Sequence, residues 1–303
     1  RLSAQNLGAI AGLLAAAMYA VVLVGRLRPA VVVSVGGYAS VAASLAAVAW
    51  RVPIIVAEQN AVPGLANRLT GRFAAASAVS FPDTPLPRAV VTGNPVRAEM
   101  CSIDRSPSGR RAAREALELP VDAAVVVVSG GSLGARRINT STLSMARTWS
   151  DRRGIAIRHV VGERDRQTMA AAAPVSVPGG LVYQQVVFEE RMDLLYGAAD
   201  LAVQRSGAGT CFELAAAGLA SVLVPLPGSP GDHQGFNARR LEAAGAAVVI
   251  VDGDLDGSRL GDVVGPLLAD PDRLRSMGQA AHRLARPDAA ARVAALVEEH
   301  ARG

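Results

Sequence analysis

Glu213 is a lone carboxylate in an alanine-rich stretch, residues 203–225, which begins with a turn of serine and glycine. The turn at 206–209 precedes a run of helical character, so its backbone N–H groups are expected at a helix N-terminus, where an anion is favoured. A carboxylate there can accept hydrogen bonds from two neighbouring hydroxyls, as a ribose offers. It can also close a capping box, because Thr210 and Glu213 follow the pattern T-x-x-E. The local pattern favours the cap and leaves both roles open.

Two further loops carry groups that could bind a ligand. Residues 125–139 repeat the order of strand, glycine turn and helix start. Two such turns suit a diphosphate, although neither matches the dinucleotide fingerprint G-x-G-x-x-G or the P-loop. Residues 230–250 contain a polar loop before another helix. Its side chains suit either hydroxyl recognition or ordinary turn and cap roles: Asp232, His233, Gln234 and Asn237.

Residues 130–134 match the pattern G-x-S-x-G, with Ser132 at the centre, and so suggest a different chemistry. This is the pattern of a hydrolase nucleophile on a strand-to-helix turn. A serine hydrolase would also need an acid and a histidine downstream, for example Asp200 and His233. That interpretation leaves the glycine turn before Glu213 without a role, so it is kept only as an alternative.

Metal binding has little support in the sequence. The aspartate pairs in residues 252–256 follow the last predicted strand in a turn-rich stretch, and we interpret them as loop residues. Cys101 and Cys211 have no metal-ligand spacing and are too few for a disulfide framework. We therefore expect no catalytic metal, no cofactor and a reduced intracellular setting.

The elements that must position these loops alternate along the chain. The core has to be built from Ala, Val and Leu, since half of the 303 residues are hydrophobic and only 4% are aromatic. Apolar runs predict buried parallel strands at 29–35, 52–59, 123–131, 155–162, 181–187, 199–207, 220–227 and 246–251. Segments with helical spacing lie between most of them. The order predicts a doubly wound α/β architecture.

The best break is at residues 90–122, whose centre is rich in Pro, Gly, Ser and charge. We expect two Rossmann-like domains with parallel sheets facing a cleft, and ligands at the carboxyl ends of the strands. The predicted boundaries are 1–96, 97–285 and a C-terminal helix at 286–303, possibly packed back on the first domain.

Residues 8–25 form an uncharged apolar run followed by Arg26 and Arg28. Its length is near the lower limit for crossing a bilayer. Because a strand follows within a few residues, we favour a buried or membrane-touching helix over a span. The net charge of +5 comes mainly from scattered arginine, which suits small anions or an anionic membrane surface better than nucleic acid.

Six blocks together resemble the MurG-type transferases, which add GlcNAc from UDP-GlcNAc to undecaprenyl-diphospho-MurNAc-pentapeptide in peptidoglycan synthesis. They read, in order, VVVSVGGYAS, IIVAEQNAVPGLANR, VVTGNPVR, VVSGGSLGARRIN, QRSGAGTCFELAAAGLASVLVPLP and GDHQGFNARRLEAAGAA. The resemblance covers about residues 30–250. It implies a glycosyltransferase-B fold and an inverting transfer to the MurNAc C4 hydroxyl, without a metal.

The resemblance also implies site residues. Asn60 would contact the sugar, and Arg97 and Ser132 the diphosphate side of the nucleotide. The phosphate-and-ribose segment would be Ala208, Gly209, Thr210, Cys211, Phe212 and Glu213, with Glu213 on the ribose hydroxyls. Gln234 would bind the GlcNAc hydroxyls. Simpler roles remain open: Arg97 as a solvated linker cation, Asn60 as a turn residue and Gln234 as a polar loop tip.

Two departures from the family pattern affect these expectations. Glu189 stands where the family usually has an apolar residue beside the uracil, so a contact there would use the backbone. The family's glycine-rich first loop, with the histidine that is the usual candidate for the general base, would precede Arg1. We expect the chain as written to bind UDP-GlcNAc but to transfer it poorly, as a UDP-sugar-binding fragment would. The lipid-linked acceptor implies a peripheral position on the cytoplasmic face of the bacterial plasma membrane.

Overall fold

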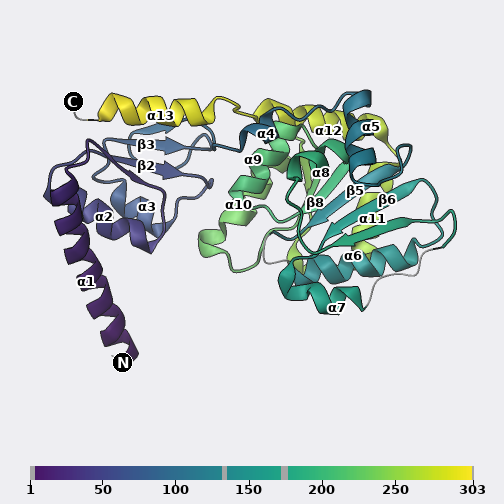
Figure 1. Ribbon diagram of the computed structural model, residues 1–303, viewed down its shortest axis with the longest axis horizontal. Coiled ribbons are helices and arrows are strands. Elements are labelled where there is room, and N and C mark those ends of the chain that lie inside the picture. Colours follow the sequence, from purple (N-terminus) through teal and green to yellow (C-terminus); the bar gives the residue numbers. More distant parts are fainter. Residues whose placement is uncertain (1–3, 132–134, 172–176, 302–303) are drawn as a thin grey trace. The chain divides into compact units, whose positions relative to one another are not determined.

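The computed structural model describes residues 4–131, 135–171 and 177–301. The chain divides into two compact units, each with its own parallel sheet (Figure 1). Unit 1 comprises Arg1–Pro95 and Asp288–Gly303, and unit 2 comprises Val96–Pro287. The predicted two-domain α/β fold with parallel sheets is confirmed. All eight runs predicted as strands contain one.

Unit 1 contains a four-stranded sheet in the order β1-β2-β3-β4, with every neighbouring pair parallel. Its strands are β1 (Val32–Ser34), β2 (Ile54–Glu58), β3 (Ala76–Val79) and β4 (Ala89–Val91). Its helices are α1 (Ala4–Leu27), α2 (Tyr38–Ala49), α3 (Leu65–Thr70) and α13 (Ala289–His300). Strands β3 and β4 were not predicted, because they are short and β3 consists mainly of small residues.

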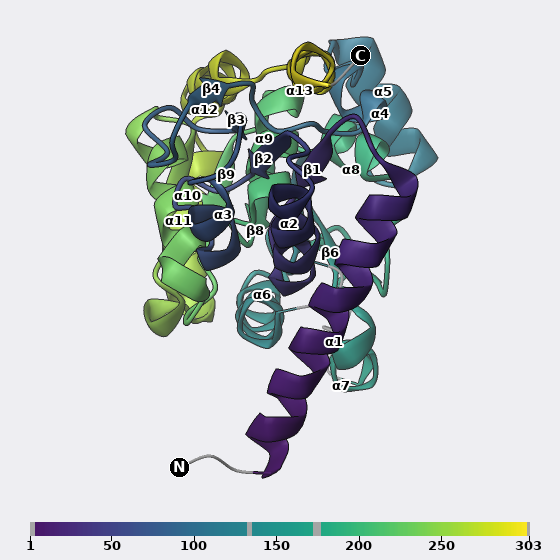
Figure 2. The ribbon, with the colours of Figure 1, turned by 90° about the vertical axis from the view of Figure 1, so that its left-hand side faces the viewer.

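Helix α1 packs along α2 (Figure 2). Ala20 and Val24 of α1 are buried in one apolar cluster with Ala46 and Ala47 of α2. The helices approach so closely that a Cβ on Gly25 would lie 2.5 Å from the Trp50 ring. Among the described residues, no helix is both long enough and apolar enough to cross a membrane.

Helix α13 belongs to unit 1 although it lies at the far end of the sequence. Its Leu296 is buried against Ile55 of β2 and Ala76 and Ala78 of β3. The small side chains of β3 therefore leave room for the apolar face of a helix that arrives from the C-terminus.

Unit 2 contains a six-stranded parallel sheet in the order β10-β9-β8-β5-β6-β7. Its strands are β5 (Ala124–Ser129), β6 (Ile155–Val160), β7 (Val182–Val186), β8 (Leu201–Gln204), β9 (Ser221–Leu223) and β10 (Ala247–Val249). The chain winds outward from β5 to β7, returns to β8 beside β5, and then winds the other way. The reversal between β5 and β8 is the switch point at which a doubly wound sheet binds its ligand.

Helices cover both faces of this sheet. Alternate residues of β5, such as Val126 and Val128, point into one large core together with α6 and α11. The helices are α4 (Ala98–Cys101), α5 (Pro107–Ala116), α6 (Arg136–Thr148), α7 (Arg166–Ala170), α8 (Met192–Ala198), α9 (Ala208–Ala217), α10 (His233–Ala243), α11 (Gly257–Leu268) and α12 (Pro271–Leu284). Single 3-10 turns are η1 (Glu163–Asp165), η2 (Pro230–Asp232) and η3 (Asp252–Asp254).

The polar segment 90–122 is not the loop-rich connection that its composition suggests, since it contains α4 and α5. Ser106 caps α5 by accepting a hydrogen bond from the Gly109 N–H, and Pro107 occupies the first helical turn. The helix then docks through buried arginine: Arg114 donates to Asp200 at 2.8 Å. Composition concealed this helix because charge, rather than an apolar face, holds it in place.

Candidate functional site

A pocket of about 530 Å³ lies in unit 2 at the carboxyl ends of β5, β6 and β8. We call it the switch-point pocket. Its lining residues come from the start of α4, the ends of β5 and β6, the loop before α8, α8 itself, the end of β8 and the first turns of α9. Polar groups in the lining include Arg97, Ser129, Glu189, Tyr196, Gln204, Arg205, Thr210 and Glu213. Its place agrees with the rule for doubly wound sheets.

Helix α9 presents its N-terminus to this pocket without a side-chain cap. Gly207 is the N-cap residue and has no side chain with which to cap the first turn. The Ser206 hydroxyl is directed elsewhere, since it donates to the Gln234 carbonyl at 2.8 Å. The first N–H groups of a helix have no partner within the helix. The turn therefore offers backbone donors and the positive end of a helix dipole to an anion.

The capping-box interpretation of Thr210 and Glu213 is wrong. Thr210 lies inside the first turn of α9, and Gly207, three residues earlier, occupies the cap position. Glu213 is the sixth residue of the helix, so its carboxylate is more than a turn away from the cap. Its side chain is available for another role.

Glu213 lies instead in a small polar cluster. Its Oε1 is 3.6 Å from Arg97 Nη2, and its Oε2 accepts a long hydrogen bond of 3.4 Å from the Tyr196 hydroxyl. Burial raises the pKa of Glu213, and the charge of Arg97 and the Tyr196 hydrogen bond lower it in part. The carboxylate is thus held in place by weak contacts and retains capacity to accept hydrogen bonds.

Tyr196 contacts the Glu213 carboxylate directly, and Gln204 contacts Tyr196. Tyr196 is a fully buried side chain on α8, and its hydroxyl also hydrogen-bonds Gln204 Oε1 at 3.1 Å. Burial, followed by the negative charge of Glu213, raises the pKa of Tyr196, so it remains a neutral donor. Neither residue was predicted from sequence. The only available signal for Gln204 was a polar residue at the end of a buried strand.

The side chains of Arg97 and Arg205 differ in how far they are exposed and held by other groups. Arg97 is the N-cap residue of α4, and 53% of its side chain is exposed. Arg205 is only 12% exposed and is 2.6 Å from Asp252 Oδ1. It also donates to the Val224 and Pro225 carbonyls, each at 3.1 Å. Arg205 therefore fixes the pocket wall, whereas Arg97 can reorient toward a ligand. The pairing also gives Asp252, one of the turn aspartates, a structural role.

Gln234 and Asn237, which the sequence predicted on a polar loop, lie in the first turns of α10, beside the α9 turn. Besides the Ser206 bond, Asn237 Nδ2 donates to the Ser206 carbonyl at 3.2 Å. The side chain of Gln234 is occupied at its oxygen, which accepts from the Leu226 N–H at 3.0 Å. Gln234 does not line the switch-point pocket. The start of α10 thus holds the turn before α9 in place.

The other predicted residues of unit 2 are placed as follows. Glu189 lines the pocket and forms an ion pair with Arg158, whose Nη2 lies 2.7 Å from its carboxylate. Cys211 and Phe212 are buried in the core, so only their backbone groups remain for a ligand. Burial raises the pKa of the Cys211 thiol to about 12. Ser132 lies outside the described residues.

The Asp200 that a hydrolase would need is at the wrong end of the sheet. It precedes β8, accepts from the Val125 N–H at 2.7 Å and pairs with Arg114. Residues 130–134 follow the carboxyl end of β5. His233 Nδ1 lies 2.8 Å from the Pro230 carbonyl instead. Asp200 therefore cannot serve as the acid in the hydrolase alternative. In the described part of the chain, no group of three or more His, Cys, Asp or Glu residues is arranged to hold a metal ion.

A buried network supports the start of α6 in unit 2. Asn139 Oδ1 is 3.0 Å from His159 Nε2, and Asn139 Nδ2 donates to Asp165 Oδ2 at 3.0 Å. His159 Nδ1 is 2.7 Å from the Tyr183 hydroxyl. Burial lowers the pKa of His159 to about 3, so it is neutral at ordinary pH.

In unit 1, Asn60 sits in a loop organised by a buried carboxylate. Glu58, 3% exposed, accepts from the Asn60 N–H at 2.9 Å and from Asn60 Nδ2 at 3.1 Å. It also accepts from the Gly64 N–H at 3.1 Å and from Asn67 Nδ2 at 2.9 Å. Asn60 is therefore held in one orientation within this loop.

Known families match both units. The glycosyltransferase family 28 C-terminal domain matches residues 125–293, and the family's N-terminal domain matches residues 1–79. The chain belongs to glycosyltransferase family 28. The C-terminal domain of this family includes the α9 turn and nearly all of the switch-point pocket.

Two relatives from different genera carry the name UDP-N-acetylglucosamine–N-acetylmuramyl-(pentapeptide) pyrophosphoryl-undecaprenol N-acetylglucosamine transferase. The relative from Nocardioides sp. is 42% identical over 274 residues, which cover 90% of this chain and 73% of the relative. The relative from Alkalilimnicola ehrlichii is 40% identical over 292 residues, 96% of this chain and 79% of the relative. The resemblance to MurG-type transferases is thereby confirmed.

A comparison with solved structures also finds a MurG-type protein. The crystal structure of Acinetobacter baumannii MurG aligns with a TM-score of 0.79 and 30% identity, covering 95% of this chain and 78% of that one. A UDP-GlcNAc 2-epimerase from Neisseria meningitidis, solved with UDP-GlcNAc, aligns with a TM-score of 0.65 and 13% identity, over 98% and 82% of the two chains. The second likeness is one of fold. The family 28 structure supports the predicted glycosyltransferase-B class.

Proposed function

We propose that this family 28 chain transfers GlcNAc, with inversion, from UDP-GlcNAc to the C4 hydroxyl of MurNAc in undecaprenyl-diphospho-MurNAc-pentapeptide. The names of its relatives support the substrates and the reaction. The structural observation that carries the proposal is an uncapped helix N-terminus beside the Arg97–Glu213 pair in one pocket. Those groups match the two features of a nucleoside diphosphate, its charge and its ribose diol.

In the proposed complex, backbone N–H groups of the first α9 turn bind the diphosphate and Glu213 accepts from the ribose hydroxyls. Arg97 turns from Glu213 to the diphosphate, since its 3.6 Å contact is long and its side chain is half exposed. Ser132 contacts the diphosphate side, Gln234 binds the GlcNAc hydroxyls and Asn60 contacts the sugar. Backbone groups beside Glu189 contact the uracil base.

The chemistry follows from where charge develops. The acceptor oxygen attacks the anomeric carbon opposite the departing UDP, so one C–O bond forms as the other breaks and the configuration inverts. Negative charge grows on the diphosphate as it leaves. Fixed N–H dipoles and a guanidinium beside that charge stabilise the transition state more than the ground state, which is how such groups accelerate transfer.

The test of this function is transfer from labelled UDP-GlcNAc to the lipid-linked acceptor, with UDP-GlcNAc binding measured in parallel by calorimetry. Arg97→Gln should weaken nucleotide binding and lower transfer, because it removes a charged donor. Arg259→Gln is the matched control, since Arg259 is exposed in the same unit and lies outside the pocket. Equal transfer by both variants would contradict the role of Arg97. Binding without transfer by the unmodified chain would instead support the alternative of a UDP-sugar binder.

We further propose that unit 1 holds the acceptor side and associates peripherally with the cytoplasmic leaflet of the membrane. Helix α1 buries Ala20 and Val24 but exposes Met18 (71%), Tyr19 (69%) and other large apolar side chains. Arg26 follows in its last turn. An apolar face next to arginine suits an anionic interface, where each arginine near the surface adds about 1 kcal/mol.

Flotation with vesicles tests the membrane proposal. Binding should require phosphatidylglycerol and decrease with salt, and the double variant Met18→Ser, Tyr19→Ser should weaken it. Val251→Ser removes an equally exposed valine (63%) from unit 2 and serves as control. Binding that ignores both lipid charge and salt would refute an interfacial mode.

A further inference from the structure

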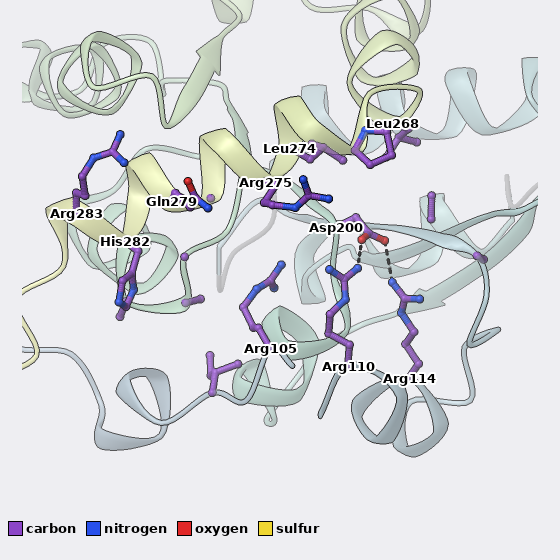
Figure 3. Close-up of a pocket in the computed structure, with 18 of the residues that line it drawn as sticks. Arg105, Arg110, Arg114, Asp200, Leu268, Leu274, Arg275, Gln279, His282 and Arg283 are labelled. Atoms are coloured by element: carbon purple, nitrogen blue, oxygen red, sulfur yellow. Dashed lines mark hydrogen bonds and ion pairs between the residues drawn. The ribbon is translucent and has the colours of Figure 1, made fainter. Parts of the chain in front are cut away.

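A second cavity in unit 2, shown in Figure 3, is about 990 Å³ in volume. It lies at the opposite end of the sheet from the switch-point pocket. We call it the arginine cavity. It is bordered by Ala123 and Ala124 at the start of β5, by Asp200 before β8, and by the last residues of α9. The two cavities share no lining residue. Substrates of doubly wound sheets bind at the other end, so the catalytic reaction does not account for this cavity.

The lining of the arginine cavity carries an excess of positive charge. It contains five arginines against two aspartates, Asp122 and Asp200. Arg105, Arg110 and Arg114 come from one wall, and Arg275 and Arg283 come from α12 on the other (Figure 3). Arg110 and Arg114 both pair with the single carboxylate of Asp200. Within the described ranges, Arg105 and Arg283 form no ion pair with any acid.

Arg105 carries a positive charge that its hydrogen-bond partners do not compensate. Its guanidinium donates to the Tyr196 carbonyl and, at 3.0 Å, to the Ala199 carbonyl. Those neutral acceptors satisfy some of its N–H groups but leave its charge uncompensated. Burial, followed by the positive charges of Arg110 and Arg114, lowers the pKa of Arg105 to about 10. A half-buried cation held beside two others is costly unless an anion joins them.

Anchoring of the chain explains only part of this arrangement. Arg110 and Arg114 attach α5 to Asp200. Arg105 donates to carbonyl groups at the C-terminal end of α8. The arginines of α12 take no part in that anchor. Arg275 pairs with Asp272 on its own helix, at 2.5 Å, and Arg283 has no carboxylate partner among the described residues. Their position across an open cavity from Arg105 is left unexplained by folding alone.

We infer that the arginine cavity binds a small organic anion carrying two or more phosphate groups. Guanidinium groups match phosphate oxygens in charge and in bidentate geometry, and cations on two walls suit more than one phosphate. The volume is within the range of small-molecule sites. Leu268, Leu274 and Ile103 supply an apolar surface for the organic part. This ligand would occupy a site separate from that of UDP-GlcNAc.

Calorimetry with inorganic pyrophosphate, in the presence of saturating UDP, tests this inference. Pyrophosphate should bind the UDP-saturated protein, more tightly than inorganic phosphate does. The double variant Arg275→Gln, Arg283→Gln should weaken its binding about tenfold, since two charge-assisted contacts are lost. Both side chains are exposed on α12, so the fold should persist. Arg273→Gln removes one positive charge from the same helix outside the cavity and should have no effect.

A second variant, Arg105→Gln, addresses the inner wall and should also weaken binding if the protein folds. The inference is overturned if the double variant binds pyrophosphate as tightly as the unmodified protein, or if UDP abolishes the binding. It is also overturned if phosphatidylglycerol vesicles bind at these arginines while soluble pyrophosphate does not, because the ligand would then be a lipid surface.

Discussion

Replacing Glu213 with glutamine separates binding from stability. In the proposed complex the carboxylate accepts from both ribose hydroxyls, and hydrogen bonds to a charged group contribute about 1.5–3 kcal/mol. Glu213→Gln should therefore weaken UDP-GlcNAc binding roughly 10- to 150-fold. Calorimetry measures this directly. Glu299→Gln, on the exposed side of α13 in unit 1, is a matched control that should bind normally.

The same variant should not lower the melting temperature at pH 7. Burial raises the pKa of Glu213, so the folded state holds the proton more strongly than the unfolded chain does. The resulting cost to stability is absent below its ordinary pKa of 4.5 and complete once the pH exceeds the raised value. Glutamine removes that cost. The Arg97 contact that is lost involves an arginine side chain 53% exposed and is worth about 0–1 kcal/mol.

The two measurements together can refute the argument. A helix cap predicts the reverse pattern, with normal nucleotide affinity and a loss of about 1 kcal/mol of stability. Unchanged affinity together with a lowered melting temperature would therefore return Glu213 to a structural role.

Two further predictions concern buried groups. Glu58→Gln should destabilise unit 1 by about 1–3 kcal/mol, measured as a lower melting temperature, because its new NH₂ group faces the donors of loop 60–67 that the carboxylate accepts; an unchanged melting temperature would show that the loop does not depend on the charge. His159, whose pKa burial lowers to about 3, binds a proton more weakly in the fold, so its contribution to stability is complete above pH 6.5 and is lost as the pH falls from 6.5 toward 3. The melting temperature should fall more steeply between pH 7 and pH 4 in the unmodified protein than in His159→Gln, and equal slopes would contradict a buried neutral imidazole.

The sequence predicts the sheets better than their connections. Strand β5 appears as a continuous apolar run because parallel strands are buried on both faces. Strand β3 has the same burial but reaches it with alanine and serine, since α13 needs space above it. That requirement comes from a helix more than 200 residues away in sequence, and no local pattern can express it.

In the candidate site, too, local sequence patterns predicted some features, and others depend on distant parts of the chain. Glycine turns at the ends of β5 and β8 locate the switch-point pocket, because strand order alone brings those ends together. The partners of Glu213 could not be predicted, since Tyr196 reaches it from a different helix through tertiary packing. The capping box failed for a local reason. Its pattern fits Thr210, but the helix already begins at Ala208.

Helix α9 connects the two ends of unit 2. Its first turn borders the switch-point pocket, and its last residues, Ala216 and Ala217, border the arginine cavity. Gly218 ends the helix in a left-handed conformation (φ 59°), and a Cβ on Gly278 of α12 would lie 2.5 Å from its carbonyl oxygen. The two glycines allow α12 to press directly on the end of α9. The position of the turn before α9 is therefore set partly by a backbone contact one helix length away, on the helix that also supplies Arg275 and Arg283.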